Sequence, residues 1–129
     1  INIELKVPGT AAWVSKVIQD RTRTHWDVNN FLVSSFNHHE IAAVKKLDDR
    51  IRIGALIAGV PLDYALFAQK LAAYSVHISI EFVNREFITD AHDRNLKVFV
   101  YTVNHPEDIA RMDDLGVDGV FTNYPDRVL

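Results

Sequence analysis

The sequence contains no cysteine, no excess of basic residues and no long apolar run. Without cysteine, disulfides and thiolate metal sites are impossible, and the redox compartment cannot be read from the chain. A formal net charge of −3 with no basic stripe argues against nucleic acid or an anionic membrane as a partner. No stretch approaches the roughly 18 apolar residues that a membrane span needs. The absence of a G-x-G-x-x-G sequence weakens a dinucleotide-binding interpretation.

The length of the chain also sets a bound. Its 129 residues suffice for one domain, but a complete (β/α)₈ barrel needs roughly 200 or more. An apolar content of 48% with 24% charged residues is typical of an ordinary globular protein. The chain opens on Ile1, inside an expected strand and without an initiator Met. We therefore expect it to be a piece of a longer protein.

The clearest pattern lies between Lys97 and Pro125 and predicts a strand, a short helix and a second strand. Residues 98–103 form a β-branched and aromatic run of strand length. Pro106 suits the first position of a helix, and Gly116 suits its left-handed end. A strand–helix–strand unit of this minimal length predicts a crossover connection within a parallel sheet.

The same alternation of strand and helix extends over the whole chain. Strands are expected near residues 1, 31, 51, 76, 97 and 119, and helices over 11–21, 38–48, 62–74, 85–94 and 106–115. The spacing predicts an α/β fold, either a doubly wound sheet or a (β/α) barrel. Polar residues gather at the expected carboxyl ends of strands, which favours the barrel: Glu4, Lys6, Ser34, Ser35, Thr102, Asn104, Thr122 and Asn123. We therefore predict a partial TIM (β/α)₈ barrel whose six parallel strands correspond to strands 3–8.

Within the helices, apolar spacing predicts which side chains face the core. The helix over 11–21 should be capped by Thr10, and the spacing of Asn37 and Glu40 predicts a capping box for the helix over 38–48. His38 and His39 are expected to be exposed in its first turn, because adjacent helical residues cannot easily share a ligand. The side chains expected to be buried in these two helices are Val14, Val17, Ile18, Ile41, Val44 and Leu47.

The segment INIELK alternates strictly between apolar and polar residues. This period predicts a strand that places Glu4 and Lys6 on one polar face. A carboxylate and an ammonium two residues apart would suit a metal ion and a phosphate together. The alternation alone is equally compatible with two solvated charges on an exposed edge strand.

Three segments in order, INIELK, LVSSFN and VYTVN followed by GVDGVFTNYP, resemble the glycerophosphodiester phosphodiesterases. The last segment is similar to the family pattern W-T-V-N and G-V-D-G-[IV]-x-T-D-x-P. Two positions depart from it, since Tyr101 stands where tryptophan is usual and Asn123 where aspartate is usual.

The resemblance implies hydrolysis of a small-molecule glycerophosphodiester to glycerol 3-phosphate and an alcohol, with a divalent cation, Ca²⁺ or Mg²⁺. It implies that Glu4 is a catalytic metal ligand and that Lys6 is catalytic and binds the phosphate. Ser35, Tyr101 and Asn104 would contact the substrate. The family's acid–base histidines and H-R-G motif precede the ELK segment. The resemblance therefore implies an inactive chain when alone, with the N-terminal part of the barrel or a second copy as its partner.

Two alternatives remain open at the level of the sequence. The first is another phosphate-handling barrel, an isomerase or synthase, in which Glu4 is a base and Lys6 steadies an enolate. The second is a non-catalytic partial barrel that serves as an association module. Activity without a divalent metal would favour the first.

Overall fold

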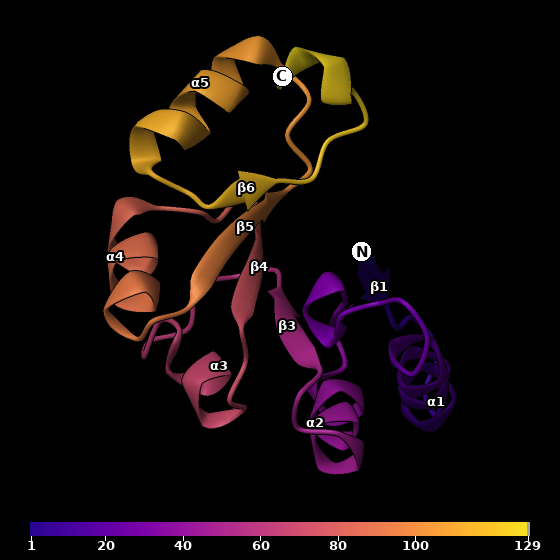
Figure 1. Cartoon of the computed structure of the whole chain (residues 1–129). Coiled ribbons are helices and arrows are strands. Elements are labelled where there is room, and N and C mark those ends of the chain that lie inside the picture. Colours follow the sequence, from indigo (N-terminus) through magenta and orange to yellow (C-terminus); the bar gives the residue numbers. More distant parts are fainter. Residues whose placement is uncertain (129) are drawn as a thin grey trace. The chain divides into compact units, whose positions relative to one another are not determined.

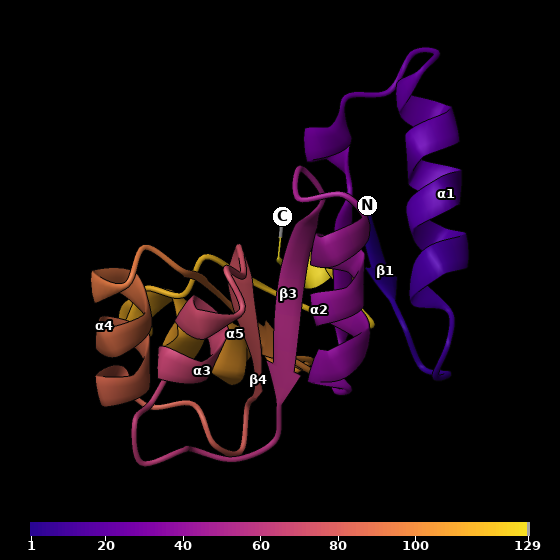
Figure 2. The same cartoon turned by 90° about the horizontal axis from the view of Figure 1, so that it is seen from below.

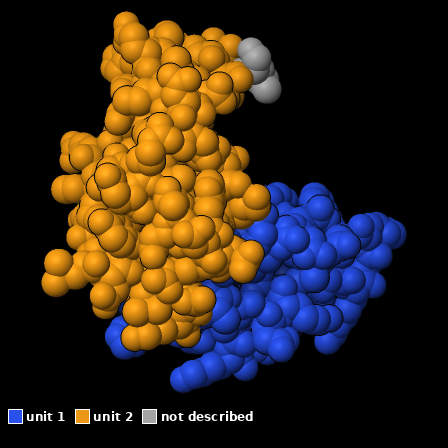
Figure 3. Space-filling model, turned by 90° about the vertical axis from the view of Figure 1, so that its left-hand side faces the viewer, with its two compact units in different colours: residues 1–56, 71–74 blue, residues 57–70, 75–129 orange. Residues whose placement is uncertain are grey.

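The computed structural model describes residues 1–128, which form two compact units (Figure 3). Unit 1 comprises residues 1–56 and 71–74. Unit 2 comprises residues 57–70 and the chain from residue 75 onward. Both units are built from parallel strands that alternate with helices along the chain (Figure 1). Within residues 1–128, no helix combines the length and the apolar character that crossing a membrane requires.

Unit 1 carries its strands in chain order. Its elements are β1 (Asn2–Glu4), α1 (Ala11–Thr22), a 3₁₀ turn (Val28–Asn30), β2 (Leu32–Ser35), α2 (His38–Leu47) and β3 (Arg52–Ile57). β1 pairs with β2 in parallel, with Glu4 opposite Ser34, and β2 pairs with β3 in parallel. Helices α1 and α2 contact each other (Figure 2). α2 also packs against β2. Val33, Ile41 and Ile53 are fully buried, which places the core between this sheet and its helices.

Unit 2 repeats the arrangement. Its elements are α3 (Leu66–Lys70), β4 (Ser75–Ser79), α4 (Arg85–Asp93), β5 (Lys97–Tyr101), α5 (Pro106–Leu115), β6 (Gly119–Val120) and a 3₁₀ turn (Pro125–Arg127). β4 pairs with β5 and β5 with β6, both in parallel, with His77 opposite Phe99. α4 packs against β5. Because all strands of a unit run the same way, their carboxyl ends meet at one edge.

Several helix ends form as the local sequence predicts. Asn84 caps α4 by accepting a 2.8 Å hydrogen bond from the amide of Phe87. Asn95 follows α4 with φ +60°, a left-handed conformation that asparagine tolerates at a helix end. α5 begins with Pro106 and ends at Gly116, which has φ +78°. These features depend on residues within one turn of each other, so the sequence displays them directly.

Other predictions about elements are wrong. The helix expected over 62–74 exists only as α3, because Tyr64 and Ala72 have positive φ and cannot extend a right-handed helix. Leu62, the first residue of the expected helix, is 99% exposed. Val17 and Leu47 are 41% and 51% exposed, although both were expected in the core. The last strand, expected near residue 119, is β6 and contains only two residues.

Candidate active site

Glu4 and Lys6 lie together at the carboxyl end of β1. Glu4 is the last residue of the strand, and Lys6 follows two positions later. The Lys6 Nζ atom lies 4.0 Å from the Glu4 Oε1 atom, with the side chains 76% and 34% exposed. An ion pair this long and this exposed contributes little to stability. Both charged groups are therefore accessible from the carboxyl edge of unit 1.

Between these two residues, Leu5 is anchored on both sides of its backbone. Its amide donates a 2.7 Å hydrogen bond to the carbonyl oxygen of Ser34. Its carbonyl oxygen accepts a 2.7 Å hydrogen bond from the Ser35 hydroxyl. Ser35, predicted to contact substrate, is buried at the end of β2, and its Oγ also accepts from the amide of Asn37 at 3.0 Å. A substrate contact by Ser35 stays a prediction, and what the structure assigns to the hydroxyl is the fixing of the β1 end.

Tyr101 and Asn104 belong to unit 2. Tyr101 is the half-buried last residue of β5, and its hydroxyl donates a 2.8 Å hydrogen bond to the carbonyl oxygen of Ile57. Asn104 Oδ1 accepts a 3.0 Å hydrogen bond from the amide of Asn123. The carbonyl oxygen of Asn104 accepts a 2.8 Å hydrogen bond from Arg127. Asn104 therefore holds the loop that follows β6, and its contact with substrate stays a prediction.

The role of Glu4 as a metal ligand stays a prediction. Within residues 1–128, no three His, Asp or Glu side chains form a group that could hold a metal ion. Ca²⁺ takes six to eight oxygen ligands, and Mg²⁺ demands octahedral geometry. The described residues therefore do not fit a complete divalent-cation site, and Glu4 is a single carboxylate beside a lysine.

Two residues of α2 make bonds that the sequence did not predict. His38 is half-buried, and its Nε2 lies 2.9 Å from the carbonyl oxygen of Leu56 at the carboxyl end of β3, so the prediction that it is exposed is wrong. The predicted capping box required the Glu40 side chain to accept from an amide at the start of its own helix, and it does not do so. Its carboxylate instead accepts from the amides of Gly9 and Ala11 at the start of α1, at 2.8 and 3.1 Å. Asn37 does cap α2, because its Oδ1 atom accepts a hydrogen bond from the amide of His39.

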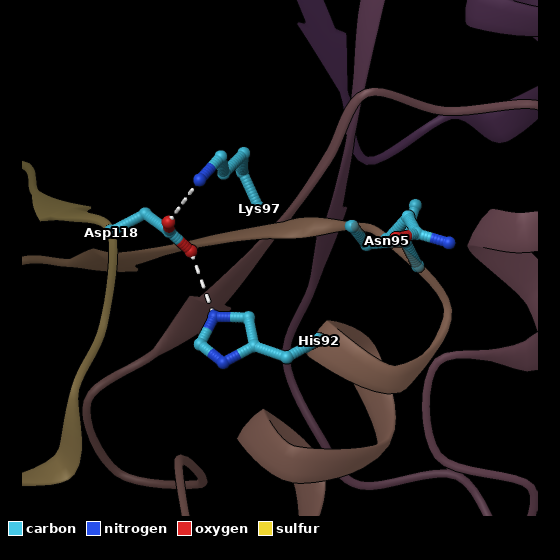
Figure 4. A pocket seen from close by; sticks show the side chains of 5 residues that line it. His92, Asn95, Lys97 and Asp118 are labelled. Atoms are coloured by element: carbon cyan, nitrogen blue, oxygen red, sulfur yellow. Dashed lines mark hydrogen bonds and ion pairs between the residues drawn. The ribbon is translucent and has the colours of Figure 1, made fainter.

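A second polar cluster lies at the opposite, amino end of β5. Figure 4 shows the Asp118 carboxylate between Lys97 and His92. Its oxygens lie 2.7 Å from Lys97 Nζ and 2.9 Å from His92 Nε2, beside a pocket of about 370 Å³. Burial alone would raise the pKa of Asp118, but hydrogen bonds from Lys97, the Val98 amide and His92 outweigh it and lower the pKa. In barrels, the amino ends of strands serve stability and the carboxyl ends carry catalysis. The cluster therefore fixes α4 and the start of β6 against β5.

His77 on β4 is the buried titratable group of unit 2. Its side chain has no exposed surface and lies against the rings of Phe99 and Phe121, with centroid distances of 5.4 and 5.1 Å. Nε2 shares a 2.9 Å hydrogen bond with the Ser75 hydroxyl, while Nδ1 has no hydrogen-bond partner within residues 1–128. Burial lowers the pKa of His77 to about 4. His77 is therefore a neutral core residue near pH 7.

Comparison with known proteins identifies the family of this chain. The model of the glycerophosphoryl diester phosphodiesterase family matches residues 4–127. The chain belongs to this family. It is 32% identical over 137 residues to a glycerophosphodiester phosphodiesterase of Bacillus altitudinis and 29% identical over 134 residues to one of Caldanaerobacter subterraneus. Each match includes 100% of this chain and 54% of the relative, so the chain spans about half the length of these curated relatives.

Solved structures of family members share the fold. A phosphodiesterase of Oleispira antarctica, in complex with the product sn-glycerol-3-phosphate, matches 98% of this chain and 52% of its own, with a TM-score of 0.83 and 25% identity. A family member from Galdieria sulphuraria matches 98% of this chain and 54% of its own, with a TM-score of 0.87 and 23% identity. These matches confirm the predicted α/β class and the partial TIM barrel.

Proposed function

We propose that this phosphodiesterase-family chain takes part in metal-dependent hydrolysis of glycerophosphodiesters to glycerol 3-phosphate and an alcohol. The observation that carries the proposal is the pair Glu4 and Lys6, exposed at the carboxyl end of β1 with 4.0 Å between their charged atoms. Catalytic residues of barrel enzymes come from this end of the strands. The glycerol 3-phosphate in the Oleispira antarctica relative supports the choice of substrate class.

Lys6 is the group assigned to the phosphate. Its exposed ammonium carries three donors and a full positive charge, which suits a phosphodiester oxygen. During hydrolysis, negative charge grows on the oxygens around phosphorus, and a fixed cation stabilises that charge most where water is excluded. Lys6 would therefore bind the substrate and favour its transition state.

Glu4 would supply one oxygen ligand to a divalent cation, Ca²⁺ or Mg²⁺. Because the described residues do not fit a complete site, the remaining ligands would come from residues outside this chain. The general acid and base for bond cleavage would come from there as well. We accordingly propose that residues 1–129 form the C-terminal portion of one barrel domain. Its partner would be the N-terminal portion or a second copy, and the chain alone would be inactive.

The experiment compares the chain alone with an enzyme completed by the N-terminal half of a family relative, using glycerophosphocholine as substrate. Release of glycerol 3-phosphate is measured with Mg²⁺, with Ca²⁺ and after chelation by EDTA. The expected result is turnover only by the completed enzyme, only with metal, and absent when Glu4→Gln and Lys6→Ala are combined. Turnover that survives chelation would instead favour a metal-independent phosphate-handling barrel. Turnover that survives both substitutions would overturn the assignment of the site.

A further inference from the structure

We propose that Glu40 is a positioning residue for Lys6, because it ties the loop that carries Lys6 to the first turn of α2. The inference rests on the proposed function, in which Lys6 binds phosphate. It concerns a residue that touches neither substrate nor metal but bonds to the end of the loop that carries Lys6.

The start of α1 lacks the groups that usually satisfy a helix amino end. Thr10 occupies the capping position, but its side chain makes no capping bond. Its hydroxyl instead donates a 2.7 Å hydrogen bond to the carbonyl oxygen of Val7. The first residues of the helix are Ala11, Ala12 and Trp13, none of which is acidic. The free N–H groups and the positive dipole end of this 12-residue helix therefore need an acceptor from elsewhere.

Glu40 supplies that acceptor across about 30 residues of sequence. One carboxylate oxygen lies 2.8 Å from the amide nitrogen of Gly9, and the other lies 3.1 Å from that of Ala11. The hydrogen bond from Gly9, with those from Ala11 and Thr10, lowers the pKa of Glu40 despite the opposing effect of desolvation. The ionised carboxylate therefore caps α1 in place of a local residue, and it joins the first turns of α1 and α2.

The bonds of Glu40 complete a chain of anchors on both sides of Lys6. Before Lys6, Leu5 is held by Ser34 and Ser35. After Lys6, Val7 is held by the Thr10 hydroxyl. Gly9 turns the chain into α1 with φ +84°, a conformation that favours glycine.

Removal of Glu40 would release the amides of Gly9 and Ala11, while the bonds at Leu5 and the local bond between Thr10 and Val7 would remain. The loop over 6–10 would then lose its tie to α2 and sample more conformations. The ordering of a mobile segment on binding weakens affinity. We therefore expect the loss of Glu40 to act on phosphate binding through Lys6, although neither its carboxylate nor α2 needs to reach the ligand.

The test uses the full chain, ¹⁵N-labelled, with Glu40→Gln as the variant. Glu86→Gln is the matched control, because Glu86 also lies in the first turn of a helix but is exposed, and Asn84 already caps that helix. In the wild type, the amide resonances of Gly9 and Ala11 should shift as acid protonates Glu40, and this shift should vanish in Glu40→Gln. ¹⁵N relaxation should report greater mobility at Lys6 and Val7 in Glu40→Gln and no change in Glu86→Gln.

Binding of sn-glycerol 3-phosphate by the completed enzyme then distinguishes positioning from general damage. Glu40→Gln should weaken the affinity by about threefold or more, a loss of the size expected when a pre-ordered contact becomes mobile. The same substitution in a Lys6→Ala background should change nothing further. Equal losses in both backgrounds, or unchanged affinity and mobility in Glu40→Gln, would overturn the role of Glu40. If the completed wild-type enzyme binds no glycerol 3-phosphate, the proposed function fails, and the relaxation of Lys6 and Val7 in the chain alone decides whether Glu40 holds the loop.

Discussion

The hydroxyl of Ser35 donates a 2.7 Å hydrogen bond to the carbonyl oxygen of Leu5 and fixes the end of β1 to the end of β2. Ser35 Oγ also accepts from the amide of Asn37, just before α2. One buried hydroxyl thus joins the segment that carries Glu4 and Lys6 to the turn from which α2 begins. The neighbouring Ser34 Oγ is equally buried but has no hydrogen-bond partner within residues 1–128.

We therefore expect Ser35→Ala to destabilise unit 1 by about 1–3 kcal/mol, since it leaves a buried carbonyl and an amide unpaired. Ser34→Ala is the matched control, because removal of an unpaired buried hydroxyl costs no hydrogen bond. The free energy of unfolding from urea titrations of the two variants measures the difference. Equal effects of the two substitutions would contradict the anchoring role of Ser35.

Acid should weaken the fold through His77. Its pKa is about 4 in the folded chain because of burial, whereas an unfolded histidine titrates near pH 6.5. Between these values the unfolded state binds more protons, so the free energy of unfolding should fall as pH drops from about 6.5 to about 4, by up to roughly 3 kcal/mol.

The His77 prediction is checked by unfolding titrations at several pH values. His77→Leu should lower stability near neutrality, because Ser75 loses its partner, but should flatten the dependence on pH over that range. His25→Asn, at an exposed loop position, should leave the dependence unchanged. An unaltered slope in His77→Leu would show that other groups cause the acid sensitivity.

In the completed enzyme, Glu4→Gln should abolish turnover at every concentration of Mg²⁺ or Ca²⁺, because the neutral amide is a poorer ligand for a hard cation. The substitution is nearly isosteric and Glu4 is partly exposed, so circular dichroism should show an intact fold. Glu81→Gln, at an exposed position after β4, serves as the control. Undiminished activity of Glu4→Gln would remove Glu4 from the site.

The sequence predicts those features that depend on neighbouring residues. Pro106 and Gly116 were assigned correctly because each acts on groups within one turn of the chain. Glu40 could not be assigned in the same way. Its position three residues after Asn37 suggested a local capping box, but its partners Gly9 and Ala11 lie 31 and 29 residues away. Only the packing of α1 beside α2 brings them within reach.

The burial of side chains was predicted less well in helices whose inward face includes polar as well as apolar residues. The face of α1 that packs inward includes Ser15, which is 2% exposed, while Val17 lies beside it and faces solvent. His38 was expected in solvent because it opens a helix, but its position brings Nε2 to the Leu56 carbonyl oxygen. Apolar spacing ranks candidate faces, whereas the direction of the neighbouring element decides which face is covered.

In the candidate site too, the sequence predicts what neighbouring residues determine but not the contacts between residues distant in the chain. The apolar–polar alternation within INIELK correctly predicted that the side chains of Glu4 and Lys6 lie together, whereas Leu5 between them is buried. The sequence could not show that Ser35 and Asn104 already hold backbone groups at the strand ends, since those partners are distant in the chain.

The most direct test of the central claim is the kcat/KM of the completed enzyme for glycerophosphocholine, with and without Lys6→Ala. Loss of the phosphate-binding ammonium should lower kcat/KM by on the order of tenfold or more, about 1.4 kcal/mol or above. Lys16→Ala, which removes an exposed lysine from α1, should leave it unchanged. If Lys6→Ala also retains the wild-type kcat/KM, Lys6 is a solvated surface charge and the proposed site at the end of β1 is contradicted.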